Sequence, residues 1–192
     1  MEPGWVGDEG LGRMMGSQEI SDQQLRDERA LQALSASYAA AADSRDGDRF
    51  AALFVEDGEL VVPNYPVDLG PVLTRSGQER LRLIPQALRH YRRTFHQVTN
   101  HEFAIDGDTA NGDVLCVAHH LTTADSSASP PPVAGTEAGE GSVEAEGTDF
   151  IWYIRYRDEY RRVDGDWKFR RRSIHLQWVE ERPVLKMAPA PG

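Results

Sequence analysis

The stretch TDFIWYIRYRDEYRRVDGDWKFRRRSIHLQWV, residues 148–179, indicates two long β-strands joined by a tight turn. Its first half alternates apolar or aromatic residues with charged ones, which is the period of a strand with one buried face. Asp164-Gly165 is a favoured pair for a two-residue hairpin turn. We therefore predict antiparallel strands at 148–163 and 167–179. The residues expected to face inward are Phe150, Trp152, Ile154, Tyr156, Asp158 and Tyr160.

The sequence before this hairpin predicts one more hairpin, and the segments before that are predicted to be mostly helical. A second turn signal, Asp106-Gly107, separates predicted strands at 94–105 and 109–123. A long helix is expected from a cap at Ser21 to about Asp43. The remaining predicted elements are a short helix around Phe50, a strand at 59–62 closed by Pro63, a loop at 64–76 and a helix at 77–91.

This order of elements favours the α+β class, because the helices come first and the hairpins follow. We expect one curved antiparallel sheet wrapped round the long N-terminal helix, with two further helices, as a cone-shaped α+β barrel around one pocket. A single domain is predicted. Its parts are a flexible N-terminal tail at 1–21, the domain at 22–182 with a disordered, low-complexity insertion at 124–147 that could alternatively be a lid, and a C-terminal tail at 183–192.

Composition narrows the class of partner. The formal net charge is -10 over 192 residues, which argues against nucleic acid and anionic membranes, since both require a basic face. Cys116 is the only cysteine, so an intrachain disulfide and a zinc ribbon are excluded. No apolar run suits a signal peptide or a membrane span, and a cytoplasmic protein is expected.

Two carboxylates are predicted in apolar surroundings. Ala36, Ala39, Ala40 and Asp43 share a second face of the long helix, which suggests that this helix is buried on two sides. A carboxylate there needs a partner, or its pKa rises. Asp158 lies between inward tyrosines, and it either pairs with an arginine such as Arg172 or lines a pocket and contacts a ligand.

The histidines are the other candidates for chemistry. His96 and His101 lie five residues apart on one strand and so face opposite sides unless a bulge intervenes. His119 and His120 also face opposite sides, and periodicity cannot choose between them. An inward histidine beside a carboxylate suits general acid–base catalysis near neutral pH.

Motifs for other chemistry are missing from the sequence. There is no His-Glu-x-x-His pair for a metal, no Gly-x-Ser-x-Gly elbow for a nucleophilic serine and no Gly-rich phosphate loop. We therefore expect neither a metal nor a cofactor. A facial triad of two histidines and one carboxylate remains an alternative.

Three segments resemble SnoaL-like and scytalone dehydratase-like proteins of the NTF2-like superfamily. They are YAAAADSRDGDRFAALFVEDGELVV (38–62), FHQVTNHEFAIDGDTANGDVLCVAHH (95–120) and YRDEYRRVDGDWKFRRRSI (156–174). The resemblance extends over about residues 31–178, interrupted by the insertion. It implies the cone fold with its enclosed pocket, and it is more specific for the fold than for the reaction.

The resemblance also implies roles for residues. Asp43 and His96 match the acid–histidine pair of scytalone dehydratase and its dehydrochlorinase relative, and His120 matches the second histidine of the dehydratase. The polar residues that the dehydratase carries on its third long strand are replaced here by Ile154 and Tyr156, so the resemblance does not give the substrate.

Together these features predict a cofactor-independent lyase, dehydratase or isomerase acting on a small aromatic or polyketide-like compound. Alternatives are a non-catalytic binding or assembly module of the same fold, and polyketide cyclisation or other chemistry in the same pocket. A homodimer or homotrimer is expected, because exposed sheet faces are commonly covered. The predicted catalytic residues are His96, Asp43 and His120, and the predicted substrate-binding residues are Tyr156, Tyr65, Asp158, Trp152, Tyr38 and Asn100.

Overall fold

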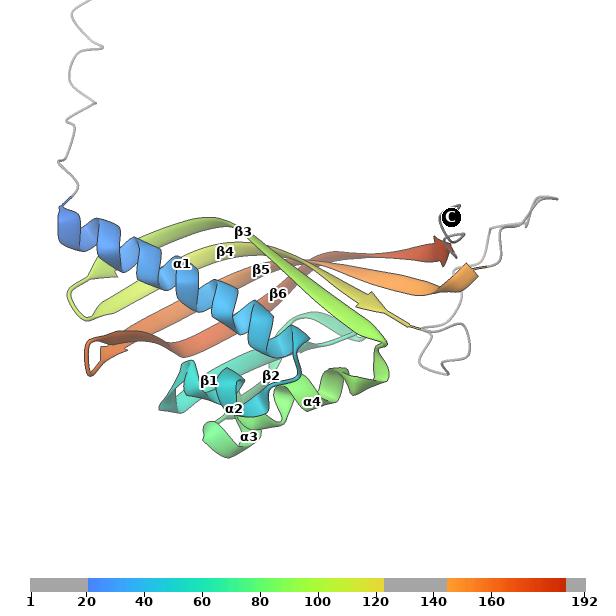
Figure 1. The fold of residues 1–192 in the computed structure, drawn as a ribbon, viewed down its shortest axis with the longest axis horizontal. Helices are drawn as coiled ribbons and strands as arrows, with labels where there is room; N and C mark the ends of the chain where they lie inside the picture. Colours follow the sequence, from blue (N-terminus) through green and yellow to red (C-terminus); the bar gives the residue numbers. More distant parts are fainter. Residues whose placement is uncertain (1–20, 123–144, 186–192) are drawn as a thin grey trace, which may run out of the picture.

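A computed structural model describes residues 21–122 and 145–185 (Figure 1). The long helix α1 spans Asp22–Asp43, and the Ser21 hydroxyl caps it by accepting a hydrogen bond from the backbone N–H of Gln24 at 3.1 Å. Leu31, Leu34 and Tyr38 share one face of this helix and are buried in the hydrophobic core. The predicted N-terminal tail lies outside the described residues except for Ser21. Of the predicted insertion, 145–147 belong to a strand, and of the predicted C-terminal tail, 183–185 belong to the last strand, so the first of these boundaries was placed too late and the second too early. The rest of both segments lies outside the described residues.

The sheet has six strands in the order β2-β1-β6-β5-β4-β3 and lies behind α1 in Figure 1. It is curved and open, with β2 and β3 at its edges, so the predicted curved sheet is confirmed and it does not close into a complete barrel. It is also not fully antiparallel, because β1 and β6 pair in parallel. The strand bounds are β1 Phe54–Asn64, β2 Asp68–Ser76, β3 Arg93–Asp106, β4 Thr109–Leu121, β5 Ala145–Val163 and β6 Asp166–Leu185.

Both predicted hairpins are confirmed. Asp106 pairs with Thr109 and Val163 pairs with Asp166, so each turn has two residues. The second turn requires positive φ at Asp164 (53°) and Gly165 (90°), the conformation that Asp and Gly tolerate best. The four long strands therefore follow the predicted order.

The region between α1 and β3 differs from the prediction. Residues 64–76, expected as a loop, contain the edge strand β2, whose Pro71 pairs with Pro63 at a register shift. Proline is tolerated there because an edge strand has one side without ladder hydrogen bonds. The helix expected at 77–91 is divided by Pro85, which cannot donate a helical hydrogen bond. The helices here are α2 Gly47–Ala52, α3 Gln78–Arg82, α4 Ile84–Ala87 and the 3₁₀ turn η1 Leu88–His90.

A β-bulge on β3 changes which side chains face inward. The register of β3 against β4 shifts between Thr99 and His101, and Asn100 between them has φ 46°. The extra residue moves later side chains to the other face of the strand. His96 and His101 therefore both face the concave side, contrary to the prediction for an unbulged strand.

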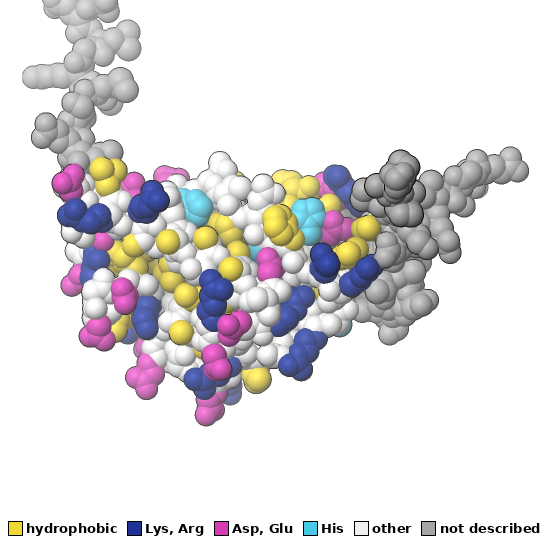
Figure 2. All heavy atoms as spheres, viewed as in Figure 1, with side chains coloured by type: hydrophobic (Ala, Val, Ile, Leu, Met, Phe, Trp, Pro, Cys, Tyr) yellow, Lys and Arg dark blue, Asp and Glu magenta, His cyan; other side chains and the backbone are white. Residues whose placement is uncertain are grey.

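Surface charge is mixed on the face that carries α1. Acidic and basic side chains are interspersed there, as Figure 2 shows. Within the described residues, none of the helices combines the length and apolarity that crossing a lipid bilayer demands.

Candidate active site

A cavity of ≈ 270 Å³ opens between α1, the short helices and the concave face of the sheet. Its lining is mostly aliphatic and aromatic, with His96, His120 and Arg75 as the strongly polar side chains. Hollows of ≈ 480 and ≈ 790 Å³ lie elsewhere on the surface, but neither includes His96 or His120. The smaller apolar cavity is therefore the candidate site.

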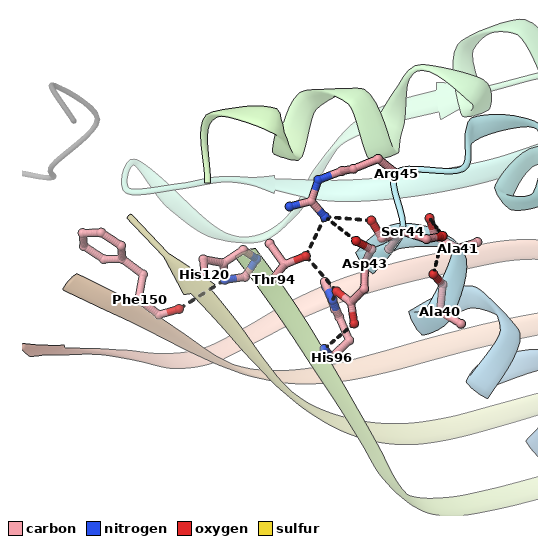
Figure 3. Close-up of polar contacts among 10 residues, drawn as sticks. Ala40, Ala41, Asp43, Ser44, Arg45, Thr94, His96, His120 and Phe150 are labelled. Atoms are coloured by element: carbon pink, nitrogen blue, oxygen red, sulfur yellow. Dashed lines mark hydrogen bonds and ion pairs between the residues drawn. The ribbon is translucent and has the colours of Figure 1, made fainter. Parts of the chain in front are cut away.

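Asp43 and His96 form a hydrogen-bonded pair at the cavity wall (Figure 3). The Asp43 Oδ1 lies 2.7 Å from the His96 Nδ1, and its Oδ2 accepts the backbone N–H of His96 at 2.9 Å. A carboxylate can only accept at neutral pH, so the His96 Nδ1 carries the proton. The Nε2 is then the nitrogen available to a ligand.

Three hydrogen-bonding groups hold Asp43 ionised. Burial opposes the charge, but hydrogen bonds from the His96 ring and backbone and from Thr94 outweigh it and lower the Asp43 pKa to about 2. The Thr94 hydroxyl donates to Asp43 at 2.7 Å and accepts from Arg45 at 2.6 Å. Arg45 also donates to the carbonyl oxygens at the end of α1, which fixes the helix terminus against β3.

The two-sided burial predicted for α1 is wrong. Ala36 and Ala40 are exposed, and Asp43 is only partly buried. Its surroundings come from β3, which lies against the C-terminal end of α1 (Figure 1) and supplies Thr94 and His96.

His120 is the histidine of its pair that faces the cavity. Its ring centroid lies 5.7 Å from that of His96 and 4.7 Å from that of Trp152. Its Nδ1 donates to the Phe150 carbonyl oxygen at 3.2 Å, because a carbonyl can only accept. Burial lowers the His120 pKa to about 3, so the ring is neutral and its Nε2 is an acceptor.

His119 faces the other side of the sheet. Its Nδ1 lies 2.7 Å from the Asp149 Oδ2, and its side chain is 36% exposed. The part of the chain that the structure describes thus carries a histidine–aspartate pair on each face of the sheet, and the inner one borders the cavity.

Asp158 is part of a buried ion pair rather than of the cavity lining. Arg172 donates to its two oxygens at 2.9 and 2.7 Å, and both side chains are fully buried. The Tyr160 hydroxyl donates to it at 2.7 Å. The guanidinium also stacks against Tyr38, Tyr156 and Phe169. The predicted pairing of Asp158 with Arg172 is therefore present, and Asp158 also borders the separate hollow of ≈ 480 Å³.

The other predicted binding residues separate into two groups. Tyr38, Trp152 and Tyr156 line the cavity. Tyr65 does not line it, although its ring lies 5.6 Å from that of Trp152. Asn100 is exposed at the bulge and is not among the lining residues.

Several residues at the site were missed. Thr94 lies two positions before His96 on the same strand. Because alternate side chains of a strand share a face, the sequence already indicated that Thr94 lies beside His96. Arg75 lies in the segment predicted as a loop. Tyr91 is the last residue of the segment predicted as a helix at 77–91, and its ring lies 4.8 Å from that of His120. Among the described residues no group of three or more His, Cys, Asp or Glu could hold a metal ion.

Comparison with known proteins agrees with this architecture. A family model described as a SnoaL-like domain matches residues 23–173. A search of the curated proteins returned no match.

Solved structures share the fold at low sequence identity. A candidate scytalone dehydratase from Novosphingobium aromaticivorans is 23% identical with a TM-score of 0.63, covering 88% of this chain and 99% of its own. A type 2 hexachlorocyclohexane dehydrochlorinase (LinA) is 21% identical with a TM-score of 0.65 at the same coverage. The LinA-type3 enzyme from Novosphingobium barchaimii is 18% identical with a TM-score of 0.64, again at that coverage. They confirm the predicted NTF2-like fold.

Proposed function

Because the chain belongs to the SnoaL-like domain family, we propose that it is a cofactor-independent lyase or isomerase acting on a small aromatic or polyketide-like compound. The observation that carries this proposal is the Asp43–His96 pair at the wall of an apolar cavity. The dehydratase and dehydrochlorinase names of the similar structures agree with an elimination.

In the proposed reaction, His96 Nε2 removes a proton from a carbon next to a carbonyl group. The ionised Asp43 stabilises the imidazolium that forms. In an elimination, the electron pair left on carbon forms the double bond and expels a hydroxyl group, which takes the proton from His96 and leaves as water. In an isomerisation, His96 returns the proton to another carbon.

The remaining cavity residues bind and orient. His120, neutral with its Nε2 as acceptor, accepts a hydrogen bond from a substrate hydroxyl group. Burial raises the pKa of Tyr156 well above its usual value, which keeps its hydroxyl protonated. A cavity of ≈ 270 Å³ is slightly below the usual range of about 300–1,000 Å³, which favours a compound of one or two rings.

The test begins with compounds that copurify with the protein, identified by mass spectrometry. These and related hydroxy-ketones are incubated with the protein in deuterated water, and deuterium at the carbon next to the carbonyl reports proton abstraction. His96→Ala is expected to reduce exchange and turnover by about 10²–10⁴-fold, because the base is lost. Asp43→Asn is expected to reduce them less.

The outer pair supplies the matched control. His119→Ala and Asp149→Asn remove the same chemical groups on the opposite face and are expected to leave activity unchanged. Circular dichroism verifies that each variant folds. Activity that survives His96→Ala excludes this mechanism, and a ligand that is bound but neither exchanged nor converted supports a binding module instead.

A further inference from the structure

Arg75 lies on the concave face beside the cavity. On the edge strand β2 it pairs across with Leu60 of β1, which pairs in turn with Arg172 of β6. Residues paired in this way share a face of the sheet. Leu60 is fully buried and lines the cavity, and Arg75 lines it too.

The two arginines in this row differ in their partners. Arg172 donates two hydrogen bonds to the Asp158 carboxylate. The one side-chain hydrogen bond of Arg75 within the described residues goes to the Thr74 carbonyl oxygen at 3.2 Å, and no ion pair there includes it. A guanidinium has five N–H donors, so most of those on Arg75 have no protein acceptor in the described part of the chain.

The cavity itself offers no carboxylate to Arg75. Its lining residues include no Asp or Glu. Asp43 is not among the lining residues, and both of its carboxylate oxygens already accept hydrogen bonds from Thr94 and His96. An arginine that has no acidic partner among the described residues and lies beside an apolar cavity is unexpected in a chain with a net charge of -10.

A ligand that enters the cavity displaces water from the Arg75 guanidinium. A neutral ligand would leave that charge poorly solvated, which costs binding free energy. A carboxylate would replace the lost water with charge-assisted, bidentate hydrogen bonds, the arrangement that arginine favours. An arginine at the cavity wall would therefore favour acids over neutral compounds of the same shape.

We propose that Arg75 selects ligands that carry a carboxylate, so that the substrate class of this cavity is a small aromatic or ketide acid. The inference rests on the proposed function for the cavity as the ligand site. Arg75 and His96 come from the two edge strands of the sheet, β2 and β3. They would hold the acidic end and the reacting carbon of one molecule from different walls.

The test measures binding rather than turnover. The probes are monocyclic aromatic acids, such as benzoate and its hydroxy derivatives, each paired with its primary amide. Isothermal titration calorimetry gives the affinities at constant ionic strength. Wild-type protein is expected to bind each acid about tenfold or more tightly than its amide, in line with hydrogen bonds to a charged group. In Arg75→Gln the two affinities are expected to become similar.

Two further variants isolate the effect. Arg80→Gln removes an exposed arginine outside the cavity lining and is expected to retain the full preference. His96→Ala is expected to retain it as well, so a carboxylate preference without turnover would separate this proposal from the proposed reaction. The proposal is overturned if no acid binds, if acid and amide bind equally to wild-type protein, or if the preference survives Arg75→Gln.

Discussion

At the scale of single residues, neighbouring groups decide what each histidine does. His96 has an ionised partner in Asp43, whereas His120 donates to a carbonyl oxygen and lies among the aromatic rings of Tyr91 and Trp152. The same side chain is thus set up for proton transfer at one position and for hydrogen bonding at the other.

Burial of His120 makes stability depend on pH. Its pKa is lowered to about 3 by burial in the folded state, against an ordinary value of 6.5. Between these values the unfolded chain binds the extra proton, so stability is present above pH 6.5 and is lost as the pH falls towards 3. The slope from this group is at most about 1.4 kcal/mol per pH unit.

Urea denaturation between pH 4 and pH 7 checks this prediction. His120→Gln is expected to flatten the pH dependence, because a neutral amide does not titrate. His119→Gln on the outer face serves as the comparison. A steep slope that persists unchanged in His120→Gln would contradict the buried, neutral state.

Sequence analysis found the central pair but not its support. The resemblance predicts Asp43 and His96 as a pair and distinguishes His120 from His119. Thr94 and Arg45 were missed because their contacts join the end of α1 to β3, residues about 50 positions apart whose packing no local pattern specifies.

At the scale of elements, strong turn signals predicted structure best. The two Asp-Gly hairpins are confirmed, since two residues suffice to define each turn. Strand β2 was missed because its burial does not alternate and it contains Pro71. Only its antiparallel pairing with β1 in the folded chain identifies this segment as a strand.

The bulge on β3 gives a prediction of its own. Asn100 has φ 46°, a left-handed conformation that costs most residues about 1–2 kcal/mol and glycine little. Asn100→Gly is expected to be nearly neutral, and Asn100→Val to destabilise by about 1–2 kcal/mol. Chemical denaturation checks both. Equal stability of the two variants would show that this backbone conformation is not maintained in solution.

At the scale of the whole molecule, the concave face has two regions with different chemistry. One is the apolar cavity with His96, His120 and Arg75. The other is the aromatic core, in which Asp158 and Arg172 are fully buried. The parallel pairing of β1 with β6 is another part of this architecture that sequence patterns did not predict, because it joins segments more than 100 residues apart.

The buried Asp158–Arg172 ion pair connects the long helix α1 with strands β5 and β6. Arg172 reaches Asp158 on β5, Ser35 on α1 at 3.3 Å and three aromatic rings around them. Removing one partner of such a pair leaves a buried charge without compensation, which typically costs about 3–5 kcal/mol. Arg172→Met is therefore expected to lower the free energy of unfolding by that amount.

An exposed ion pair serves as the comparison for the stability change. Arg155 and Asp113 lie 2.6 Å apart with side chains 41% and 34% exposed, so Arg155→Met is expected to cost about 1 kcal/mol or less. Adding Asp158→Asn to Arg172→Met is expected to recover part of the loss, because the unpaired charge is then gone. Urea denaturation followed by circular dichroism measures all three variants. If Arg172→Met costs no more than Arg155→Met, the helix and sheet are held together by apolar packing alone, and the ion pair contributes no more than a surface one.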